Sequence, residues 1–395
     1  MVSHRSRSGW WFPAVALVLT GWCANQYVPL MGWYQQERGL SELASTLVLA
    51  SYVLGLLPAL LFGGNWADRY GRKPFTLVAL GCSLTASLVM MLGQFNPLGL
   101  YAGRVLTGLG MGLAMVAATT WVKQSAGAKG ASRAGLSTSL GFALGPVLSA
   151  AIVGMSGSPE VAYAAHAAST LLWFIPLWLL AAEMDTRQAV VAAGPGTSTQ
   201  NMRRFTWIVL PMAPWVFGLA TSGFAIVPAL VNNAQGPSLL VSTATVAFTM
   251  GMGVLVQPLV ERFNRPDSVR MIVLGLVVGL VAYAFIVLAA LTGQVFVGLL
   301  GSFTAGCANG ILLKGGLTQV LDLAAEAEAG KLTGRFYAMC YVGFLFPTLM
   351  ALFRNLGDPL YFVLLLALAC GLCLLLVLAG RRFLPGRGGL QVVKH

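Results

Sequence analysis

The sequence predicts an all-α integral membrane protein of twelve transmembrane helices. Of its 395 residues, 57% are hydrophobic and only 9% are charged, whereas soluble proteins carry about 25% charged residues. A spanning helix needs about 20 apolar residues, so a chain of this length with short turns holds about twelve. Lipid offers no partner to unpaired backbone groups, which excludes isolated strands. The apolar runs are also too long and continuous for an alternating barrel.

The distribution of positive charge predicts the orientation of the chain. The formal net charge of +12 could suggest a nucleic-acid partner. If the first helix starts in the cytoplasm, however, all of the 24 lysines and arginines except Arg38, Arg104 and Arg354 fall in cytoplasmic segments. This asymmetry follows the positive-inside rule. We therefore expect a multi-pass protein of the plasma (inner) membrane, with both termini in the cytoplasm, the lipid bilayer as a partner and no nucleic acid.

The first helix is expected at about residues 10–35. This run is too long for the apolar region of a signal peptide and lacks a small-residue cleavage site, so we expect the helix to be retained. It carries Asn25 and Gln26, two adjacent amides that are costly in a membrane unless they face protein or water. We interpret them as part of a substrate-binding site, and hydrogen bonds between helices are the alternative.

A charged stretch separates the second helix, at about 42–62, from the third, at about 74–93. It reads Gly64-Asn65-Trp66-Ala67-Asp68-Arg69-Tyr70-Gly71-Arg72-Lys73. Such a concentration of charge cannot lie in hydrocarbon, so we expect a short aqueous turn. The cations alone would fix the orientation, and Asp68 therefore needs a reason of its own.

The stretch resembles the cytoplasmic signature of the major facilitator superfamily, G-x-x-x-D-R-x-G-R-K, and a chance match by a positive-inside anchor is the alternative. Every specified position is present: Gly64, Asp68, Arg69, Gly71, Arg72 and Lys73. The resemblance implies a transporter built of two pseudo-symmetric six-helix bundles. It also implies a conformational gate on the cytoplasmic side. There Asp68 would meet the positive N-terminal end of helix eleven, and the contact would break when the halves rock.

The fourth helix, at about 99–122, holds Arg104 well inside an apolar run. A buried arginine is expensive and is by default a candidate for function, here substrate binding. The alternative is a side chain that reaches the nearby outer surface. Arg104-x-x-Thr107-Gly108-x-Gly110 resembles the R-x-x-Q-G-x-G motif of the same family, with Thr107 in place of glutamine. Gly108 and Gly112 are spaced to let another helix approach closely.

The fifth helix, at about 133–154, contains Gly141, Gly145 and Pro146. The two glycines form a flat face, and the proline is expected to kink the helix. This group resembles the G-x-x-x-G-P core of the family's antiporter motif, although Ser149 and Ala150 stand where further glycines are usual. The resemblance implies export by exchange. Ordinary packing of a membrane helix is the alternative.

The sixth helix, at about 161–182, includes His166 near its outer end, where we expect an interfacial residue rather than a proton relay. The longest polar segment follows it, and the composition of residues 194–199 indicates a flexible linker. The predicted domains are therefore an N-terminal six-helix half (1–182), a cytoplasmic linker (183–204) and a C-terminal six-helix half with a short basic tail (205–395).

The second half repeats the first weakly, as expected of the duplicated halves of this superfamily. After a helix that begins near 239, Glu261 and Arg262 stand at the acidic and the first basic position of a second copy of the signature. We expect a weaker mirror of the gate there. In helices seven and ten, Trp215 and Asn309 are further candidates for substrate binding.

The sequence lacks the features of several other functional classes. It has no nucleotide-binding loop and no cluster of His, Glu and Asp at metal-ligand or protease spacing. We therefore expect no ATP-driven pump, no enzyme, no cofactor and no metal site. A channel or a receptor stays a minority interpretation, since nothing resembles a selectivity filter.

The expected function is secondary transport of a small molecule by alternating access between the halves, in a protein that can work as a monomer. All Asp and Glu residues lie in loops or at helix ends, so the central carboxylate common in proton-driven carriers is missing. Because Arg104 is the clearest buried charge, a neutral or anionic substrate fits better than a cation. The preferred direction is export of a small amphipathic compound, with protons as the coupling ion. Uptake of a sugar or an organic anion is the alternative.

Overall fold

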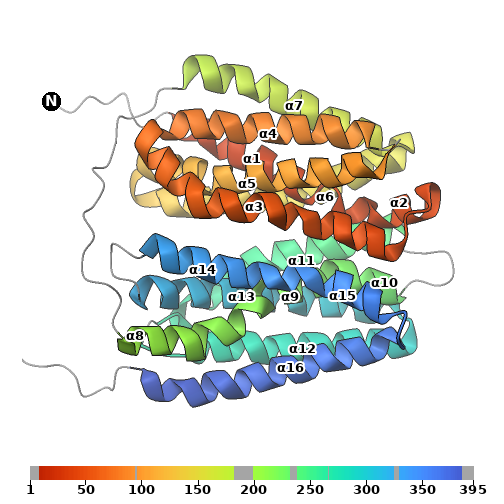
Figure 1. The fold of residues 1–395 in the computed structure, drawn as a ribbon, viewed down its shortest axis with the longest axis vertical. Helices are drawn as coiled ribbons and strands as arrows, with labels where there is room; N and C mark the ends of the chain where they lie inside the picture. Colours follow the sequence, from red (N-terminus) through yellow and green to blue (C-terminus); the bar gives the residue numbers. More distant parts are fainter. Residues whose placement is uncertain are drawn as a thin grey trace, which may run out of the picture.

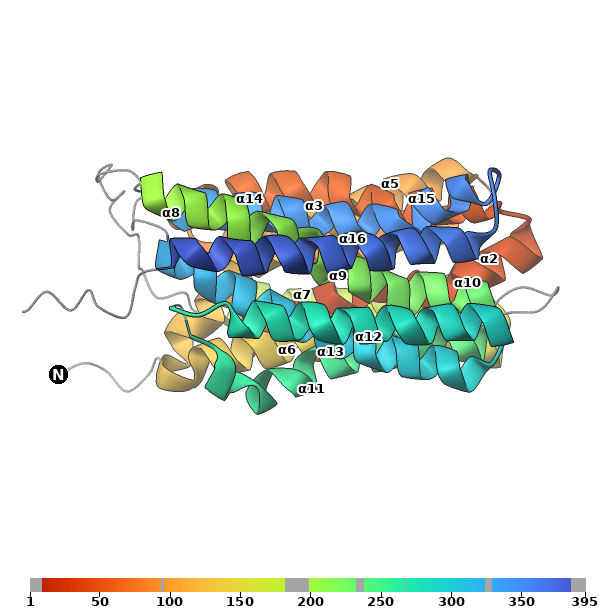
Figure 2. The same cartoon turned by 90° about the horizontal axis from the view of Figure 1, so that it is seen from below.

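The computed structural model describes residues 9–93, 96–181, 199–231, 238–265, 267–323 and 329–384. Within these ranges every regular element is a helix, and twelve spans are long and apolar enough to cross a membrane. The long helices run side by side in both views (Figure 1, Figure 2). The prediction of an all-α protein with twelve membrane-spanning helices is confirmed.

The first six spans are formed by residues before 181. Their elements are α1 (Trp11–Asn25), η2 (Val28–Leu30), α2 (Met31–Arg38), α3 (Glu42–Tyr70), α4 (Arg72–Leu92), α5 (Pro97–Ser125), η3 (Gly127–Lys129), α6 (Gly130–Ser156) and α7 (Pro159–Leu180). Side-chain oxygens satisfy the exposed amides at two of the helix starts. Ser41 accepts from the backbone N–H of Ala44 before α3, and Asn96 accepts from that of Leu98 before α5.

The other six spans follow residue 199. Their elements are α8 (Thr199–Arg204), η4 (Phe205–Val209), α9 (Leu210–Thr221), η5 (Ser222–Ile226), α10 (Val227–Val231), α11 (Leu239–Leu259), η6 (Glu261–Phe263), α12 (Arg270–Thr292), α13 (Val295–Leu323), α14 (Ala329–Val342), η8 (Gly343–Leu345), α15 (Phe346–Phe353), α16 (Pro359–Gly380) and η9 (Arg381–Phe383). The run from α8 to α10 is a single span in which two stretches, η4 and η5, are π-helical.

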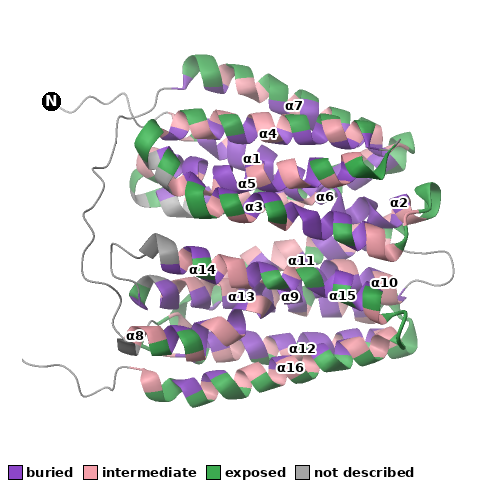
Figure 3. Cartoon of the chain, viewed as in Figure 1, coloured by how far each residue is buried: buried purple, intermediate pink, exposed green. Residues whose placement is uncertain are grey.

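The most buried and the least buried spans take the same positions in both sets of six helices. The spans of α1–α2 and α8–α10 are 78% and 72% buried, whereas those of α7 and α16 are each only 28% buried. Each set therefore packs around its first helix and exposes its last helix along the outer face, as the colouring by burial shows (Figure 3). Apolar residues on such an outer face are the ones that contact lipid in a membrane-spanning bundle.

Two lines of contact join the two sets of helices. Along the first, α3 packs against α14, η8 and α15; along the second, α6 packs against α11. We call the end of the bundle where α3 begins the Glu42 end and the end where α3 meets α4 the Gly71 end. The Glu42 end lies on the side of α2 in Figure 1. A cross-contact near the Gly71 end joins Leu61 of α3 and Gly334 of α14, where an added Cβ would lie 2.8 Å from Leu61 Cδ2.

Glycines allow the closest helix pairs. A Cβ added at Gly108 would lie 1.9 Å from the carbonyl oxygen of Tyr52, and one at Gly55 would lie 1.9 Å from that of Val105. The backbones of α3 and α5 are thus in direct contact. Gly112 meets Ala59 of α3 in the same way, at 2.5 Å. The close approach predicted from the glycine spacing of the fourth helix is confirmed.

The charged stretch after the second span is not the aqueous turn that the sequence suggested. α3 continues as a helix to Tyr70, and α4 starts at Arg72. Only Gly71, with a φ of 102°, separates the two helices. A helix satisfies its own backbone bonds and can extend past the apolar core, so one residue in a conformation that favours glycine is enough for the reversal.

The first span is also not one continuous helix. α1 ends at Asn25, and the short 3-10 turn η2 precedes α2. Pro29 lies in this turn and has no N–H to donate to the carbonyl four residues earlier. The prediction of one unbroken helix over about 10–35 is therefore wrong at this point. The break leaves carbonyl groups in the last turn of α1 available to other side chains.

Candidate functional site

The break after α1 lies against the most deeply buried arginine. Arg104 is 1% exposed on α5, so its side chain does not reach the surface at the helix end. Its Nη1 donates to the carbonyl oxygen of Ala24, in the last turn of α1, at 2.7 Å. Its Nη2 donates to the carbonyl oxygen of Leu49, in α3, at 3.4 Å. The guanidinium thus holds three helices together at the point where α1 ends.

Two tyrosine rings cover the guanidinium, and no carboxylate neutralises it among the described residues. The Arg104 Cζ atom lies 4.8 Å from the ring centroid of Tyr52 and 5.7 Å from that of Tyr27. Such stacking suits arginine, whose planar cation is weakly hydrated. Its Nε has no hydrogen-bond partner in the described part of the chain. The site therefore holds a desolvated positive charge and one nitrogen, Nε, without a hydrogen-bond partner among the described residues.

The two adjacent amides at the end of α1 point in different directions. Asn25 is half-buried and donates from Nδ2 to the carbonyl oxygen of Phe142, in α6, at 3.3 Å. Gln26 is fully buried and donates from Nε2 to Ser87 Oγ, in α4, at 2.9 Å. Gln26 Oε1 is buried and has no partner among the described residues. Both amides make the interhelical bonds that were the alternative interpretation, and Gln26 still offers one acceptor.

His166 lies deep in this half, contrary to the expected interfacial position. It is fully buried on α7. Its Nδ1 lies 2.7 Å from Ser87 Oγ, and its Nε2 lies 3.0 Å from the carbonyl oxygen of Leu19. The Trp22 ring packs edge-on against the imidazole, with the ring centroids 5.3 Å apart. A buried chain of polar groups therefore runs from α7 through α4 to the break after α1.

A cluster of aromatic rings crosses from one set of helices to the other beside Arg104. We call Tyr52 of α3, Phe217 of α9, Tyr341 of α14 and Phe344 of η8 the central aromatic cluster. Their ring centroids lie 4.5 Å apart for Phe217 and Tyr341, and 5.9 Å apart for Tyr52 and Phe344. Tyr52 therefore contacts the guanidinium on one side and the second set of helices on the other. Sequence reasoning missed this cluster, because no spacing along one helix indicates it.

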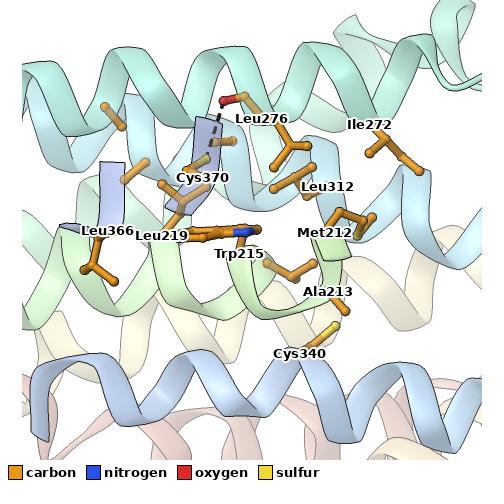
Figure 4. Packing of buried hydrophobic residues seen from close by; sticks show 14 of the residues in the cluster. Met212, Ala213, Trp215, Leu219, Ile272, Leu276, Leu312, Cys340, Leu366 and Cys370 are labelled. Atoms are coloured by element: carbon orange, nitrogen blue, oxygen red, sulfur yellow. Dashed lines mark hydrogen bonds between the residues drawn. The ribbon is translucent and has the colours of Figure 1, made fainter. Parts of the chain in front are cut away.

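Trp215 does not join these residues. Its ring is 3% exposed in the apolar core of the second half, where Figure 4 shows it surrounded by aliphatic side chains such as Leu219, Leu276 and Leu312. Asn309 of α13 lies in the same half and is 8% exposed, donating from Nδ2 to the carbonyl oxygen of Val216 at 2.7 Å. Both residues hold the second half together in this structure.

Some of the predicted gate residues bond to other helix ends of the first half, and others do not. Arg72 is buried and donates to Gln124 at the end of α5, and Lys73 donates to the carbonyl oxygen of Ala181, just after α7, at 2.7 Å. These two cations tie together helix ends within the first half. Arg69 is exposed and stacks on its neighbour Tyr70. Gly64 lies within α3 with open space around its Cα, and the side chain of Asp68 lies outside the described residues.

The second copy of the signature makes no contact of the expected kind. Glu261 forms an ion pair with Lys314 of α13, in its own half. Arg262 is exposed and stacks on Phe263, with Cζ 4.9 Å from the ring centroid. The expected mirror contact of Glu261 across the halves is therefore replaced by a contact inside the second half. The Glu261 carboxylate lies beside α13 of the same half because α11 ends at Leu259 and η6 then turns the chain back.

The glycine motif of α6 packs on α1. A Cβ at Gly141 would lie 2.3 Å from the carbonyl oxygen of Val18, and one at Gly145 would lie 2.5 Å from Trp22 Cα. Pro146 lies inside α6, which runs without a break. The flat face expected from the sequence thus brings α6 against the helix that carries Asn25.

An ion pair joins the two halves at the Glu42 end. Arg354, which follows α15, places Nε 2.8 Å from a carboxylate oxygen of Glu42, the first residue of α3. The Glu42 side chain is half-buried and that of Arg354 is exposed. Among the described residues this is the one ion pair between the two sets of helices. Near the same end, an added Cβ at Gly154 of α6 would lie 3.9 Å from Leu239 of α11.

No metal centre accompanies these residues in the part of the chain that the structure describes. No group of three or more His, Cys, Asp or Glu side chains there is placed to hold a metal ion. The six cysteines are unpaired, and none lies in an exposed position.

Solved structures share this fold. One, a POT family transporter in complex with 5-aminolevulinic acid, has a TM-score of 0.80 and 11% sequence identity, covering 97% of each chain. Another, the peptide transporter POT in complex with sulfate, has a TM-score of 0.76 and 13% identity, covering 96% of each chain. At this level of identity the likeness establishes the fold alone.

Curated relatives match a shorter part of the sequence. The chain is 37% identical over 82 residues to the multidrug resistance protein MdtL of Shigella flexneri serotype 5b (strain 8401), and equally to that of Escherichia coli (strain K12 / DH10B). These matches span 21% of this chain and 21% of each relative.

A family comparison covers most of the chain. The model described as Major Facilitator Superfamily matches residues 13–348. With the twelve spans and the signature beside Gly71, this match establishes that the chain is a multi-pass membrane transport protein belonging to the major facilitator superfamily.

Proposed function

We propose that the chain exports a small amphipathic compound, neutral or anionic, in exchange for protons. It would work as a monomer in the plasma (inner) membrane, with the Gly71 end and both termini in the cytoplasm. One observation carries the proposal. The desolvated Arg104 and the central aromatic cluster lie side by side, and together they contact both halves of the molecule.

The aromatic rings favour an amphipathic compound. Rings bind flat apolar groups by stacking and burial, and they tolerate many shapes because these contacts are not directional. Tyr341 and Tyr52 are each 4% exposed, so a compound that reached them would be almost wholly desolvated. Aromatic side chains with a few polar groups typically line the binding sites of small organic molecules.

Arg104 sets the expected charge of the compound. Its guanidinium has one nitrogen, Nε, without a hydrogen-bond partner, and no carboxylate partner among the described residues. A carbonyl group or an anion would complete its hydrogen bonds, whereas a cation would be repelled. Gln26 Oε1 and the half-buried Asn25 lie near the same break after α1 and offer polar contacts.

The relatives support the outward direction. These relatives are named multidrug resistance proteins. The glycine face of α6 resembles the antiporter motif of the family. Uptake of an organic anion is the second candidate. The observation that favours it is the same unneutralised Arg104.

Three dyes of different charge would test the proposal. The protein would be expressed in bacteria that lack their own efflux pumps, and the cells loaded with neutral Nile red, anionic fluorescein or cationic ethidium. We expect energised cells to expel Nile red faster than cells with an empty vector, and a protonophore to stop this efflux. Ethidium efflux should match the vector. Purified protein should also melt at a higher temperature with Nile red than without it, because a ligand stabilises the folded state.

The outcomes separate the candidates. Faster entry of fluorescein, lost in Arg104→Ala, would replace export by uptake of an anion. Efflux of ethidium would contradict the charge argument. Arg270→Lys, at an exposed cation that begins α12, is the matched control and should leave every rate unchanged.

A further inference from the structure

The buried polar chain around His166 has no role in the site as described above. His166 is the one histidine among the described residues, since His4 and His395 lie outside them. It sits seven residues after Pro159, which places it about 10 Å along α7 from the Glu42 end. An ionisable side chain that is fully buried inside a membrane span is by default a candidate for function.

The partners of His166 define which nitrogen carries the proton in the neutral form. The carbonyl oxygen of Leu19 can only accept, and it lies 3.0 Å from Nε2. Nε2 therefore carries the hydrogen, and the lone pair of Nδ1 faces Ser87 Oγ at 2.7 Å. Ser87 donates its hydroxyl hydrogen to Nδ1 and accepts from Gln26 Nε2 at 2.9 Å. The chain of donors thus runs from Gln26 through Ser87 to His166.

The hydrogen bonds between Gln26, Ser87 and His166 can also point in the opposite direction. When Nδ1 takes a proton, it donates to Ser87 Oγ, and the hydroxyl hydrogen of Ser87 must turn to another acceptor. Cys23 Sγ lies 4.0 Å away, and Gln26 Oε1, buried and without a partner among the described residues, becomes an acceptor if the amide rotates. Both ring nitrogens remain hydrogen-bonded in either state. The same rotation changes the polar group that Gln26 presents beside Asn25 and the break after α1.

The surroundings contain few other titratable groups. Those on α1, on α5 and on α7 itself are Cys23, Arg104, Tyr163 and Glu160. Glu160 pairs with Arg38 at the Glu42 end, and Tyr163 bonds to Tyr34. On the neighbouring α4 and α6, Arg72, Lys73 and Arg133 lie near the Gly71 end, and Cys82 lies within the span. No carboxylate among them contacts the imidazole.

We propose that His166 binds the coupling proton of this transporter, and that Ser87 and Gln26 link that proton to the substrate site. This inference rests on the proposed export by proton exchange. The proton comes from water on the outer side and adds to Nδ1; it returns to water on the cytoplasmic side after the halves rock. An imidazolium without a carboxylate partner is costly in a closed, dry site. The protonated form therefore favours a conformation in which water reaches His166, and this preference couples the proton to the rocking motion.

A spectroscopic experiment tests the site without any substrate. Full-length protein with ¹⁵N-labelled histidine would be placed in lipid nanodiscs, and the His166 signals assigned by their loss in His166→Gln. We expect the Nε2-protonated neutral ring at about pH 8 and protonation of Nδ1 only on lowering to about pH 4, since a buried imidazolium without a carboxylate partner is costly. Ser87→Ala should shift the midpoint, whereas Ser169→Ala, which removes a hydroxyl on α7 that donates to the carbonyl oxygen of Ala165 at 2.8 Å, should not. A ring that stays neutral throughout would overturn the proposal.

Two neutral replacements separate a proton site from a structural one. Glutamine can keep the bond to Leu19, and asparagine can keep the bond to Ser87, but neither can titrate. We expect both His166→Gln and His166→Asn to lose protonophore-sensitive efflux of Nile red, down to the rate of vector cells, with Ser169→Ala unchanged. If either variant retained that efflux, His166 would have a structural role only.

The two experiments distinguish failure of the inference from failure of the proposed function. If wild-type cells expel no dye, export has failed, and the nanodisc titration alone decides whether His166 binds a proton. If wild-type efflux follows the proton gradient while His166 never titrates, the proton is carried elsewhere and the inference is wrong.

Discussion

Gly108→Ala is expected to destabilise the folded protein strongly, as much as Gly55→Ala at the facing position of α3. The new Cβ would lie 1.9 Å from the carbonyl oxygen of Tyr52 and 2.8 Å from the backbone N of Leu56. Backbone atoms cannot rotate away as a side chain does, so α3 and α5 would have to separate. Overpacking typically costs about 1–3 kcal/mol, and this contact should lie at the upper end of that range or above it.

The melting temperature of the purified variant would measure this effect. Gly251→Ala is the matched control, because Gly251 also lies inside a long helix, α11, but has nothing within 4 Å of an added Cβ. That control should melt at or slightly above the wild-type temperature, since alanine favours helix over glycine. Equal melting of the two variants would contradict the direct contact of α3 and α5.

Arg104→Met is expected to abolish transport while leaving the protein folded. Replacing a buried charge by an apolar side chain of similar volume is often neutral or stabilising, because the cost of desolvating the charge disappears. The melting temperature should therefore change little. The compound would lose the one buried cation beside the central aromatic cluster, and efflux of Nile red should fall to the rate of vector cells.

Arg104→Lys separates the effect of the charge from the effect of the hydrogen bonds. An ammonium keeps the charge but cannot donate to both Ala24 and Leu49 while it lies flat on Tyr52. Losing about one hydrogen bond of roughly 1 kcal/mol should slow efflux about fivefold to tenfold. Wild-type efflux in the methionine variant would show that Arg104 only holds helices together.

The twelve spans could be predicted from the sequence because the physics is local. About 20 apolar residues fill the bilayer whatever the rest of the chain does. The glycine faces could also be predicted from the sequence. Gly108 and Gly112 lie on one side of a helix, as do Gly141 and Gly145, and each pair contacts another helix. Arg104 was recognised because a lone cation in an apolar run is costly wherever it lies.

The partners of these residues could not be predicted, because they come from distant parts of the chain. Arg104 stacks on Tyr52 of another helix, and Glu42 pairs with Arg354 of the other half. His166 was expected at the interface because a histidine near a helix end has no local sign of burial. Its burial follows from Ser87 and Leu19, which α4 and α1 bring to it.

Trp215 illustrates the opposite error. An aromatic residue on a predicted central helix is equally compatible with a binding site and with an apolar core. Packing against Tyr283 and Phe346, with ring centroids 6.0 and 5.5 Å away, places it in the core. The helical continuation of α3 through Tyr70 was missed for another reason: charge marks where lipid ends, but it does not mark where a helix ends.

Linking the two halves at the Glu42 end would test alternating access most directly. Glu42 and Arg354 would be replaced together by cysteine and joined with a short bifunctional thiol reagent, since their side chains already meet across the halves. Each single-cysteine variant, treated alike, is the control for reaction at native cysteines. We expect efflux of Nile red to stop in the linked double variant and to return when a reductant cleaves the link. Undiminished efflux through linked halves would contradict transport by rocking of the two halves.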